Sequence, residues 1–306
     1  MRVILNPAAR HGAGRRLRPL IERELESRRL EFDIVETEGP GHAVELARRA
    51  ADASVARVVA AGGDGTVHEV ANGLMSASGA PPSLGLIPIG TGNDFVKMVP
   101  GTSSRAQAFE TLASGIEKPV DVGVARWDDR TEYFMNAMGT GIDVEVVRQM
   151  RRSGWMPGMM IYLAALMRAL VNFRPIPVRL QIDELDSSGS IMILAVCNGP
   201  SIGGAFRVCP QARPDDGVLD VCVVSELPLH RILRVVPRVL RGTHEGQPGI
   251  SMHRGTRVRL GGIGGDPFPF QLDGELREAN GDVDVSLAAR QLNVVCNSPA
   301  VSGRKA

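Results

Sequence analysis

The first 121 residues alternate short apolar segments with amphipathic ones, and this alternation constrains the fold more than any other feature of the chain. Such a pattern is typical of a parallel sheet covered by helices. We expect strands at Arg2–Leu5, Phe32–Glu36, Ala56–Ala61 and Leu84–Pro88. Apolar residues at three- and four-residue spacings predict helices over Leu17–Arg28, Ala43–Ala51 and Thr66–Met75. The sequence therefore predicts a doubly wound α/β domain, in which ligands bind outside the carboxyl ends of the strands.

After Asp121 the pattern changes to β-branched runs separated by Gly, Pro and Asp, which is typical of antiparallel β-structure. We expect strands at Pro177–Ile182, Ile191–Cys197, Val218–Val224, Thr256–Leu260, Pro269–Leu272 and Val283–Leu287. Two predicted helices interrupt them, near Met159–Val171 and at Leu229–Leu240.

At 306 residues the chain is long enough for two domains. We assign residues 1–121 to the α/β domain and residues 122–289 to a mainly antiparallel, sandwich-like β domain. A return of the segment at about 290–306 to the first domain is left open.

Composition excludes several classes of protein. With 43% hydrophobic and 23% charged residues the chain is an ordinary globular protein, and a net charge of +1 gives no overall field that would attract nucleic acid.

The N-terminus lacks the pattern of a signal peptide, and the most apolar stretch is shorter than the roughly 20 residues that span a bilayer. Four scattered cysteines without a C-x-x-C pair are typical of reduced core residues. We expect a cytoplasmic protein without a transmembrane helix.

The strongest local motif is Gly62-Gly63-Asp64-Gly65-Thr66, which follows a predicted strand and opens a predicted helix. Consecutive glycines let a backbone approach an anion, and the amides at a helix start favour phosphate. The glycine spacing fits neither a Walker loop nor a dinucleotide fingerprint. A carboxylate at Asp64 is explained if it reaches Mg²⁺, directly or through water. The alternative is a tight turn in which Asp64 only caps the helix.

A second motif, Gly90-Thr91-Gly92-Asn93-Asp94, also leaves a strand and enters a short predicted helix, Phe95–Val99. Its glycine amides and Thr91 suit another phosphate, and Asp94 adds a second carboxylate. Asp121 supplies a third at the predicted domain boundary, although an isolated Asp there is more often structural. Together the three carboxylates suggest a metal-assisted transfer site.

A third motif, Asp273-Gly274-Glu275, lies in the β-rich half. An Asp-Gly pair between apolar segments is usually a hairpin turn. Glu275 would nevertheless suit a general base, because removing a proton from a hydroxyl group needs a carboxylate within hydrogen-bond reach.

These motifs in this order resemble the catalytic domain of the diacylglycerol kinase family, which includes bacterial lipid kinases and sphingosine kinases. Two further elements share the resemblance, namely Asn6-Pro7 with Gly12 and Gly14, and the segment 210–220 with the sequence PQARPDDGVLD. The matching elements run from residue 6 to residue 275, so the resemblance covers nearly the whole chain. Similar GGDG loops occur in NAD kinases and phosphofructokinases.

The resemblance implies an ATP- and Mg²⁺-dependent lipid kinase with an N-terminal domain like those of NAD kinases and diacylglycerol kinases. It implies ATP contacts from Asn6, Thr37, Gly62, Gly63, Asp64, Gly65, Thr66, Glu69, Gly90 and Thr91. It also implies that Asp64, Asp94 and Asp121 organise a catalytic Mg²⁺ through water, with Glu275 as general base. A second, structural Mg²⁺ would be held by the Asp216 side chain and by the backbone carbonyls of Arg213 and Val218.

Two other functions remain as alternatives. An NAD kinase-like enzyme would share the ATP loop but phosphorylate a soluble nucleotide. A regulator that binds lipid or nucleotide would have no chemical reason to keep Asp64, Asp94 and Glu275 together.

A lipid kinase must meet its substrate at a membrane surface, and the helix predicted at Leu229–Leu240 offers a docking face. Its arginines recur at spacings of three, four and three, at positions 231, 234, 238 and 241, while Leu229, Ile232, Leu233, Val236 and Leu240 occupy the other side. We expect Pro237 to kink this helix or end it early. The alternative is a solvated basic face with its apolar side in the core.

The apolar segment from Trp155 through Tyr162 to Phe173 suits an acyl-chain groove, with a core helix as the alternative. A homodimer is left open.

Overall fold

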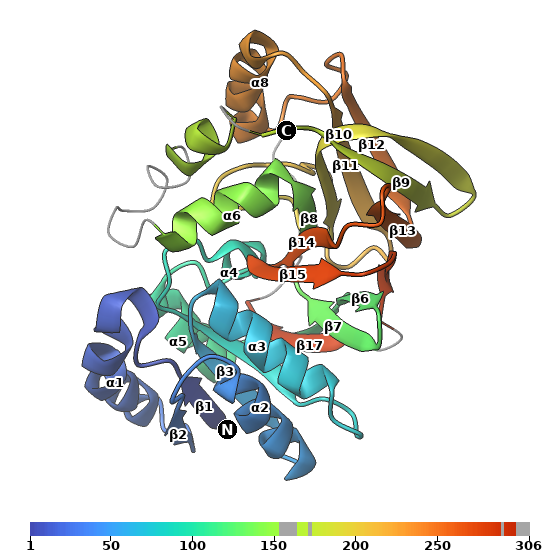
Figure 1. The fold of residues 1–306 in the computed structure, drawn as a ribbon. Coiled ribbons are helices and arrows are strands. Elements are labelled where there is room, and N and C mark those ends of the chain that lie inside the picture. Colours follow the sequence, from blue (N-terminus) through green and yellow to red (C-terminus); the bar gives the residue numbers. More distant parts are fainter. Residues whose placement is uncertain (153–163, 171–172, 289–290, 298–306) are drawn as a thin grey trace. The chain divides into compact units, whose positions relative to one another are not determined.

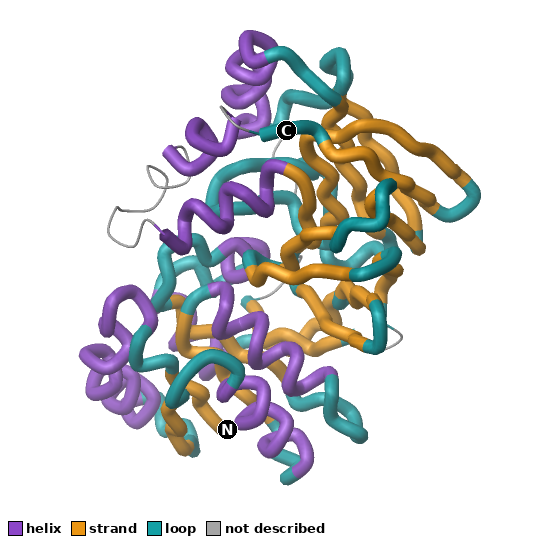
Figure 2. The backbone as a smooth tube through the Cα atoms, viewed as in Figure 1, coloured by secondary structure: helices purple, strands orange, loops and turns teal. Residues whose placement is uncertain are grey.

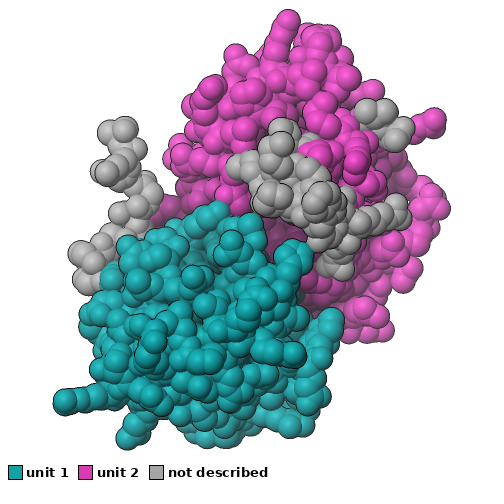
Figure 3. All heavy atoms as spheres, turned by 90° about the vertical axis from the view of Figure 1, so that its left-hand side faces the viewer, with its two compact units in different colours: residues 1–121, 290–306 teal, residues 122–289 magenta. Residues whose placement is uncertain are grey.

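The computed structural model describes residues 1–152, 164–170, 173–288 and 291–297, and it divides into two compact units. Unit 1 comprises residues 1–121 and 290–306, and unit 2 comprises residues 122–289 (Figure 3). Within the described residues, no helix is long and apolar enough to cross a bilayer.

Unit 1 is built on a six-stranded sheet in the order β2-β1-β3-β4-β17-β5. Figure 1 labels β1, β2, β3 and β17 of this sheet. Its strands are β1 (Arg2–Leu5), β2 (Asp33–Glu36), β3 (Arg57–Gly62), β4 (Ser83–Pro88), β5 (Ile116–Val120) and β17 (Leu292–Cys296). Neighbours from β2 to β17 run parallel, whereas β5 is antiparallel to β17. The four predicted strands agree with β1 to β4 to within a residue. Neither β5 nor β17 was predicted as a strand.

Helices follow the strands of unit 1, and those between β1 and β4 connect parallel strands, because each such strand must return to the same end of the sheet. They are α1 (Ala9–Ser27), α2 (His42–Asp52), α3 (Asp64–Met75), α4 (Asp94–Met98) and α5 (Arg105–Ser114). Side chains of α1 and α5, such as Ile21 and Phe109, pack with Val59 in one buried cluster. The alternate residue Val58 is equally buried and points to the opposite face of the sheet.

Helices α2 and α3 pack closely against each other. A side chain at Gly73 would place its Cβ 2.3 Å from the backbone oxygen of Val44, so this contact requires glycine. Helix α1 begins at Ala9, earlier than predicted, but residues 10–12 have left-handed backbone, so its regular turns begin only after Gly12. The predicted doubly wound class is confirmed for this unit.

Unit 2 contains an eleven-stranded sheet with antiparallel pairing throughout. Figure 2 draws its strands in orange. Its first strands are β6 (Gly123–Trp127), β7 (Arg130–Phe134), β8 (Ala137–Gly141), β9 (Ile176–Ile182), β10 (Leu185–Cys197) and β11 (Leu219–Ser225). The later ones are β12 (Ile250–Gly255), β13 (Arg257–Gly262), β14 (Phe268–Leu272), β15 (Glu275–Ala279) and β16 (Val283–Leu287). The predicted mainly antiparallel class is confirmed.

The core of unit 2 gathers the inward residues of these strands. Trp127 meets the ring of Phe270 edge-on, with centroids 5.0 Å apart. All four cysteines are buried and free, as the sequence predicted. Burial raises the pKa of Cys222 to about 12, so its thiol stays protonated and is not a nucleophile.

The helices of unit 2 differ from the sequence prediction in two ways. Helix α6 (Ile142–Arg152) was not predicted, because it follows β8 directly at Gly141, whose φ is 85°. Helix α8 (Leu229–Arg241) runs through Pro237 and ends at Gly242 in left-handed backbone, so the early end expected at the proline is wrong. The carbonyl that loses its donor belongs to Leu233, an exposed residue that water can reach. Of the helix predicted near Met159–Val171, residues 164–170 are helical and the rest lies outside the described residues.

Candidate functional site

The first glycine turn joins β3 to α3 at the carboxyl edge of the parallel sheet in unit 1. Gly63 is the N-cap residue of α3 and has an extended backbone. It has no side chain that could cap the helix. The first amides of α3 therefore have no side-chain acceptor at this end and suit an anion. Asp64 is the first residue of α3 and Gly63 precedes it, and a role of Asp64 toward Mg²⁺ stays a prediction.

The carboxylate of Asp64 is directed at the second glycine turn. Its Oδ1 atom accepts the backbone N–H of Asp94 at 2.7 Å. A Cβ at Gly92 would lie 2.7 Å from Asp64 Oδ2, so Gly92 leaves the space that this carboxylate occupies. The predicted site residues Asp64 and Asp94 are thus in contact, through the side chain of the first and the backbone of the second.

The two glycine turns touch each other through their backbones. Gly62 pairs with Pro88 at the ends of β3 and β4, and its carbonyl accepts the N–H groups of Ile89 and Gly90 at 2.8 and 3.1 Å. A Cβ at Gly90 would lie 2.5 Å from Gly63 Cα. Any side chain at Gly90 would therefore separate the turns.

Asn93 holds the second turn in shape. Its backbone is left-handed, with φ at 51°, and its Nδ2 atom donates to the carbonyl of Gly90 at 3.1 Å. The buried Oδ1 atom of Asn93 has no hydrogen-bond partner. Thr91, between the two glycines, is exposed. The turn therefore exposes glycine backbone and the Thr91 side chain, with an unpaired amide oxygen buried behind them.

Asn6 connects the end of β1 to the first turn. Its Nδ2 atom donates to Thr66 Oγ1 at 3.1 Å, and its Oδ1 atom accepts the N–H of Ala8 at 3.0 Å. Thr66 in turn lies over Gly62, where a Cβ would be 2.2 Å from the Thr66 hydroxyl oxygen. Three predicted residues of the site, Asn6, Gly62 and Thr66, are thus joined.

Thr37 and Glu69 lie toward the start of α2. Thr37 follows β2, is buried, and donates its N–H to the carbonyl of Leu5 at 2.9 Å. Glu69 accepts the N–H groups of Gly41 at 2.9 Å and Ala43 at 3.1 Å, one on each carboxylate oxygen. Glu69 therefore caps α2, whose N-cap residue, Gly41, has no side chain to do so. Contact of either residue with a nucleotide stays a prediction.

Asp121 is buried at the end of unit 1, where its Oδ1 atom accepts the Nε2 amide of Gln291 at 2.7 Å. In the part of the chain that the structure describes, no three His, Cys, Asp or Glu side chains gather closely enough to hold a metal ion. The predicted trio of Asp64, Asp94 and Asp121 is therefore not present as a direct ligand cluster. A role for these groups through water stays a prediction.

An open pocket of about 520 Å³ lies beside the second glycine turn. Gly90 and Asn93 form one wall, and Arg10, Ser104 and Arg105 line another part. Neither arginine was predicted as a site residue from the sequence. Arg10 sits in left-handed backbone two residues before Gly12, and this irregular turn with adjacent basic residues was the available signal.

In unit 2, Asp273 and Gly274 form the turn of the hairpin between β14 and β15, as an Asp-Gly pair predicts. Both have positive φ, at 49° and 90°. The Asp273 carboxylate accepts three backbone N–H groups, from Met135 at 2.7 Å, Asn136 at 2.9 Å and Ala137 at 3.0 Å. Asp273 thus fixes the turn to the segment before β8.

Glu275 is the first residue of β15 and is half-buried. A polar chain supports the turn beside it: Gln271 accepts the N–H of Gly274 at 2.6 Å and donates to Asp143 Oδ2 at 2.8 Å. Asp143 and Gln271 are both buried, and neither was predicted. Gly139 leaves room for Asp143, because a Cβ there would lie 2.0 Å from Asp143 Oδ2.

Of the residues predicted to hold a structural Mg²⁺, Asp216 has a partner on each carboxylate oxygen. Asp216 accepts the N–H of Val218 at 3.4 Å on Oδ1, and its Oδ2 atom pairs with the guanidinium of Arg254. The side chain of Arg213 donates to Asp215 at 3.2 Å. The Asp216 carboxylate is therefore shared with Arg254, and a structural Mg²⁺ held by Asp216, Arg213 and Val218 stays a prediction.

Arg254 also faces Asp220, its direct neighbour across the β11–β12 pair, with Nε 3.5 Å from Asp220 Oδ1. Asp220 is buried and its Oδ2 atom has no partner. Burial raises the pKa of the Asp220 carboxyl, and the neighbouring Arg254 opposes that shift.

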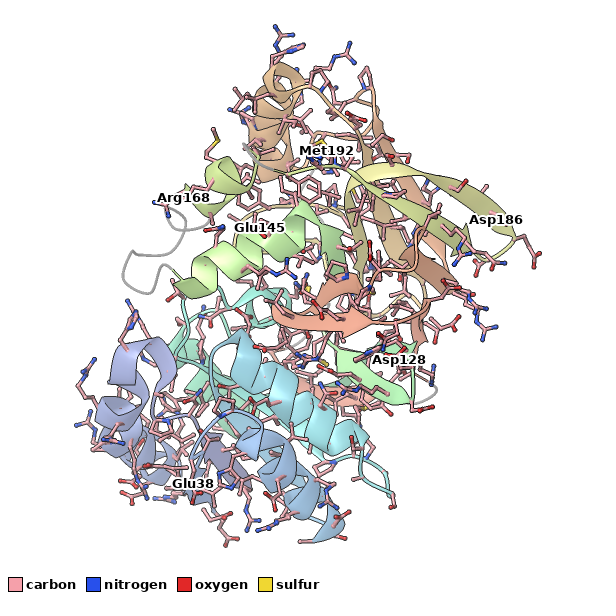
Figure 4. The ribbon with its side chains drawn as sticks, in the orientation of Figure 1. Glu38, Asp128, Glu145, Arg168, Asp186 and Met192 are labelled. Atoms are coloured by element: carbon pink, nitrogen blue, oxygen red, sulfur yellow. The ribbon has the colours of Figure 1, made fainter. Side chains whose placement is uncertain are left out.

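An apolar cavity lies between α6, the helix at 164–170, β10 and α8, within unit 2. Its volume is about 90 Å³, and Met192 on β10, below α8 in Figure 4, contributes to its wall. The lining is apolar except for Asp143, and it includes Ile142, Val146, Leu166, Leu170, Ile193, Phe206, Ile232, Val235, Val236 and Val239. Leu166 and Phe173 of the predicted acyl-chain segment pack here, whereas Trp155 and Tyr162 lie outside the described residues.

The chain is similar to known proteins over most of its length. The family model of the diacylglycerol kinase catalytic domain matches residues 1–125, and that of the YegS C-terminal NAD kinase beta sandwich-like domain matches residues 136–296. A diacylglycerol kinase of Bacillus subtilis (strain 168) is 29% identical over 277 residues, which is 90% of this chain and 89% of that protein. One of Mycobacterium tuberculosis (strain H37Rv) is 31% identical, over 84% of this chain and 83% of that protein.

Solved structures share the fold. A crystal structure of a proposed diacylglycerol kinase from Bacillus anthracis (strain Sterne) has a TM-score of 0.79 at 25% identity, and it covers 98% of this chain and 96% of that one. Both family models and the curated relatives span nearly all the elements described above. The chain therefore belongs to the diacylglycerol kinase family.

Proposed function

We propose that the chain is an ATP- and Mg²⁺-dependent lipid kinase that phosphorylates a hydroxyl group of a diacylglycerol-like lipid. The observation that carries the proposal is the backbone contact between the two glycine turns, with Gly63 against Gly90 at the edge of the unit 1 sheet. Backbone amides and a helix start can bind phosphate only where side chains leave room, as they do here.

The residues of unit 1 fit the phosphates of ATP. In this proposal the amides from Gly62 to Thr66 and the Gly90-Thr91 turn bind the phosphate oxygens, while Asn6 orients the Thr66 hydroxyl through its 3.1 Å hydrogen bond. Asp64 and Asp94 would hold Mg²⁺ through water. When bound, Mg²⁺ neutralises charge on the phosphate oxygens during transfer.

Glu275 would act as the general base of unit 2. Its carboxylate takes the proton of the lipid hydroxyl while the hydroxyl oxygen bonds to the γ-phosphorus. The bond from that phosphorus to the bridging oxygen breaks, and ADP leaves with the electron pair. Asp273 and Gln271 support this role because they fix the turn that precedes Glu275. A base must be held in place if it is to meet the hydroxyl group in the correct geometry.

The apolar cavity of unit 2 supports a lipid rather than a soluble nucleotide as the acceptor. An NAD-like acceptor would need polar partners for its ribose and phosphates, whereas Asp143 is the polar exception in the lining of this cavity. At about 90 Å³ the cavity is smaller than the roughly 150 Å³ that admits benzene in an engineered protein, so an acyl chain would have to widen it.

One assay tests the proposal. The protein with ATP and Mg²⁺ is offered diacylglycerol, a sphingoid base, phosphatidylglycerol and NAD, and labelled phosphate on each acceptor is measured. Phosphate on diacylglycerol supports the proposal, whereas phosphate on NAD alone shows the NAD kinase-like alternative. No transfer to any acceptor, with ATP or lipid still bound, shows the regulator.

The Leu166→Trp variant tests the acyl-chain site separately, because Leu166 is 7% exposed and lines the cavity. We expect it to shift preference toward shorter acyl chains while the midpoint of thermal unfolding shows that the fold is kept. Unchanged preference in a folded variant would separate the cavity from the substrate. Access to such a substrate would require peripheral association with the membrane from the cytoplasm.

A further inference from the structure

Helix α8 of unit 2 carries large apolar side chains on its outer surface. Leu229, Leu233 and Leu240 are 49%, 47% and 37% exposed. Positions four and eleven residues apart fall on one side of an α-helix, so the three leucines form a single row. No residue of α8 is fully buried. The spacing in the sequence predicts all the apolar residues of this helix on one side, whereas the structure divides them into two sets.

The other apolar set faces inward. Ile232, Val235, Val236 and Val239 line the cavity described above, opposite Leu166 and Leu170 of the helix at 164–170. The core of unit 2 therefore accounts for these four residues. It does not account for the outer row of leucines.

A row of arginines runs along the outer surface as well. Arg231, Arg234 and Arg241 are exposed, and Arg238 is half-buried with its Nη1 atom donating to the carbonyl of Arg234 at 2.9 Å. In the described part of the chain, none of these arginines forms an ion pair. The segment 229–241 contains four Arg and no Asp or Glu, although the whole chain has a net charge of only +1.

Exposed leucines and arginines without ion pairs on the same helix fit a surface that is apolar below and anionic above. The interface of a phospholipid bilayer has this order, with acyl chains beneath phosphate head groups. A protein partner would need matching acidic and apolar groups at helical spacing, whereas a fluid bilayer presents both to any such helix.

We infer that α8 docks this protein on an anionic phospholipid bilayer, with Leu229, Leu233 and Leu240 entering the acyl boundary and the arginines contacting lipid phosphates. The inference rests on the proposed lipid kinase function, because that function needs access to a bilayer. It also places the docked helix directly over the apolar cavity, so that one helix contacts the bilayer outside and the cavity inside. Displacing a helix without fully buried residues costs little free energy. An acyl chain that enters from the bilayer could therefore widen the cavity at the wall that α8 forms.

The test measures binding of the full chain to vesicles by co-sedimentation, without ATP, and so does not depend on catalysis. Vesicles are made of phosphatidylcholine alone or with phosphatidylglycerol. The variant with Arg231→Gln, Arg234→Gln and Arg241→Gln should bind the anionic vesicles about a hundredfold more weakly. The variant with Leu229→Gln, Leu233→Gln and Leu240→Gln should bind about tenfold more weakly or worse.

Matched controls lie on the same unit. Leu185→Gln removes a leucine that is 48% exposed on β10, and Arg257→Gln removes an exposed arginine on β13. Both controls should bind vesicles like the unchanged protein. Equal loss in controls and α8 variants, or unchanged binding by the α8 variants, would overturn the inference. So would a change of oligomeric state in the α8 variants by gel filtration, because a second copy of the chain would then cover the helix.

A kinase assay with diacylglycerol dispersed in detergent separates this inference from the proposed function. The α8 variants should keep activity in detergent and lose it on vesicles. If the unchanged protein binds anionic vesicles through α8 yet phosphorylates no lipid in either form, the docking surface stands and the lipid kinase proposal fails.

Discussion

Asp64 accepts the backbone N–H of Asp94 at 2.7 Å, and this hydrogen bond ties the first residue of α3 to the second glycine turn. The carboxylate thus has a structural partner on one oxygen, while its other oxygen lies in the space that Gly92 leaves. The Asp64 side chain therefore both connects the two glycine turns and is the proposed group for holding Mg²⁺ through water.

We expect Asp64→Asn to lower turnover about 100- to 1000-fold, because an amide loses the charge that holds Mg²⁺ but can still accept the N–H of Asp94. Steady-state kinetics over a range of Mg²⁺ concentrations measure the effect. Asp52→Asn, at an exposed residue of α2 paired with Arg48, is the control. Near-normal turnover of the Asp64→Asn variant would remove Asp64 from its proposed role.

Gly90→Ala should weaken ATP binding and lower the midpoint of thermal unfolding. The new Cβ would lie 2.5 Å from Gly63 Cα, and forced overpacking of this kind costs about 1–3 kcal/mol. Calorimetric titration with ATP measures the binding. Gly79→Ala is the control, because a Cβ there meets no atom within 4 Å. If both variants bind ATP equally well, the contact between the turns does not shape the phosphate site.

Glu275→Gln should lower the chemical step about 100- to 10,000-fold and leave ATP affinity unchanged, since the base acts only on the acceptor hydroxyl. Single-turnover measurements separate chemistry from binding. Glu278→Gln lies on the same strand, at an exposed position, and should behave like the unchanged protein. Normal chemistry in the Glu275→Gln variant would show that another group takes the proton.

His244 should make the stability of unit 2 depend on pH. It is buried, its Nε2 atom bonds to the carbonyl of Val208 at 2.9 Å, and its Nδ1 atom has no partner. Burial lowers the pKa of His244 below its ordinary value of 6.5, although the Val208 carbonyl and nearby Glu245 oppose the shift.

The unfolded chain therefore binds a proton at His244 more readily than the folded one. The free energy of unfolding should fall as pH drops below 6.5 and level off below the folded pKa. Urea unfolding at a series of pH values measures this. His244→Gln should flatten the profile in that window, whereas His230→Gln, at an exposed position, should not. An identical slope in both variants would assign the effect to other groups.

Arg254→Met should create affinity for a divalent cation, because it removes the guanidinium that pairs with Asp216 and faces Asp220. We expect one additional Mn²⁺ per chain by electron paramagnetic resonance, measured without ATP. Arg259→Met, which removes an arginine next to Asp282 and Asp284, is the matched control. If the unchanged protein binds an ATP-independent Mn²⁺ that Asp216→Asn abolishes, the structural Mg²⁺ site implied by family resemblance is present after all.

Local signals predicted the parts of this molecule that depend on neighbouring residues in the chain. The first four strands, the glycine turns and the Asp273-Gly274 hairpin turn all follow from short-range patterns. Contacts between distant segments had no such signal. The Asp273 carboxylate bonds to Met135, 138 positions away, and Asp143 bonds to Gln271, 128 positions away. Arg254 is an ordinary strand residue until the β11–β12 register places it beside Asp220.

Helix α8 shows the same limit on a smaller scale. Its heptad-like spacing predicted one apolar side and one basic side, but spacing alone could not divide the apolar residues between cavity and solvent. That division depends on where the helix at 164–170 and β10 lie, and it leaves Leu233 outside and Val236 inside.

Strand β17 lies between β4 and β5 in the sheet of unit 1, where Val294 pairs with Leu84. During synthesis, the sheet behind the glycine turns therefore has a gap until the ribosome has made residues 292–296, after all of unit 2. A ribosome stalled within unit 2 would release a chain whose β4 and β5 lack their shared neighbour, and such unpaired strands invite aggregation. Strand β17, which is made after unit 2, therefore completes the sheet of unit 1.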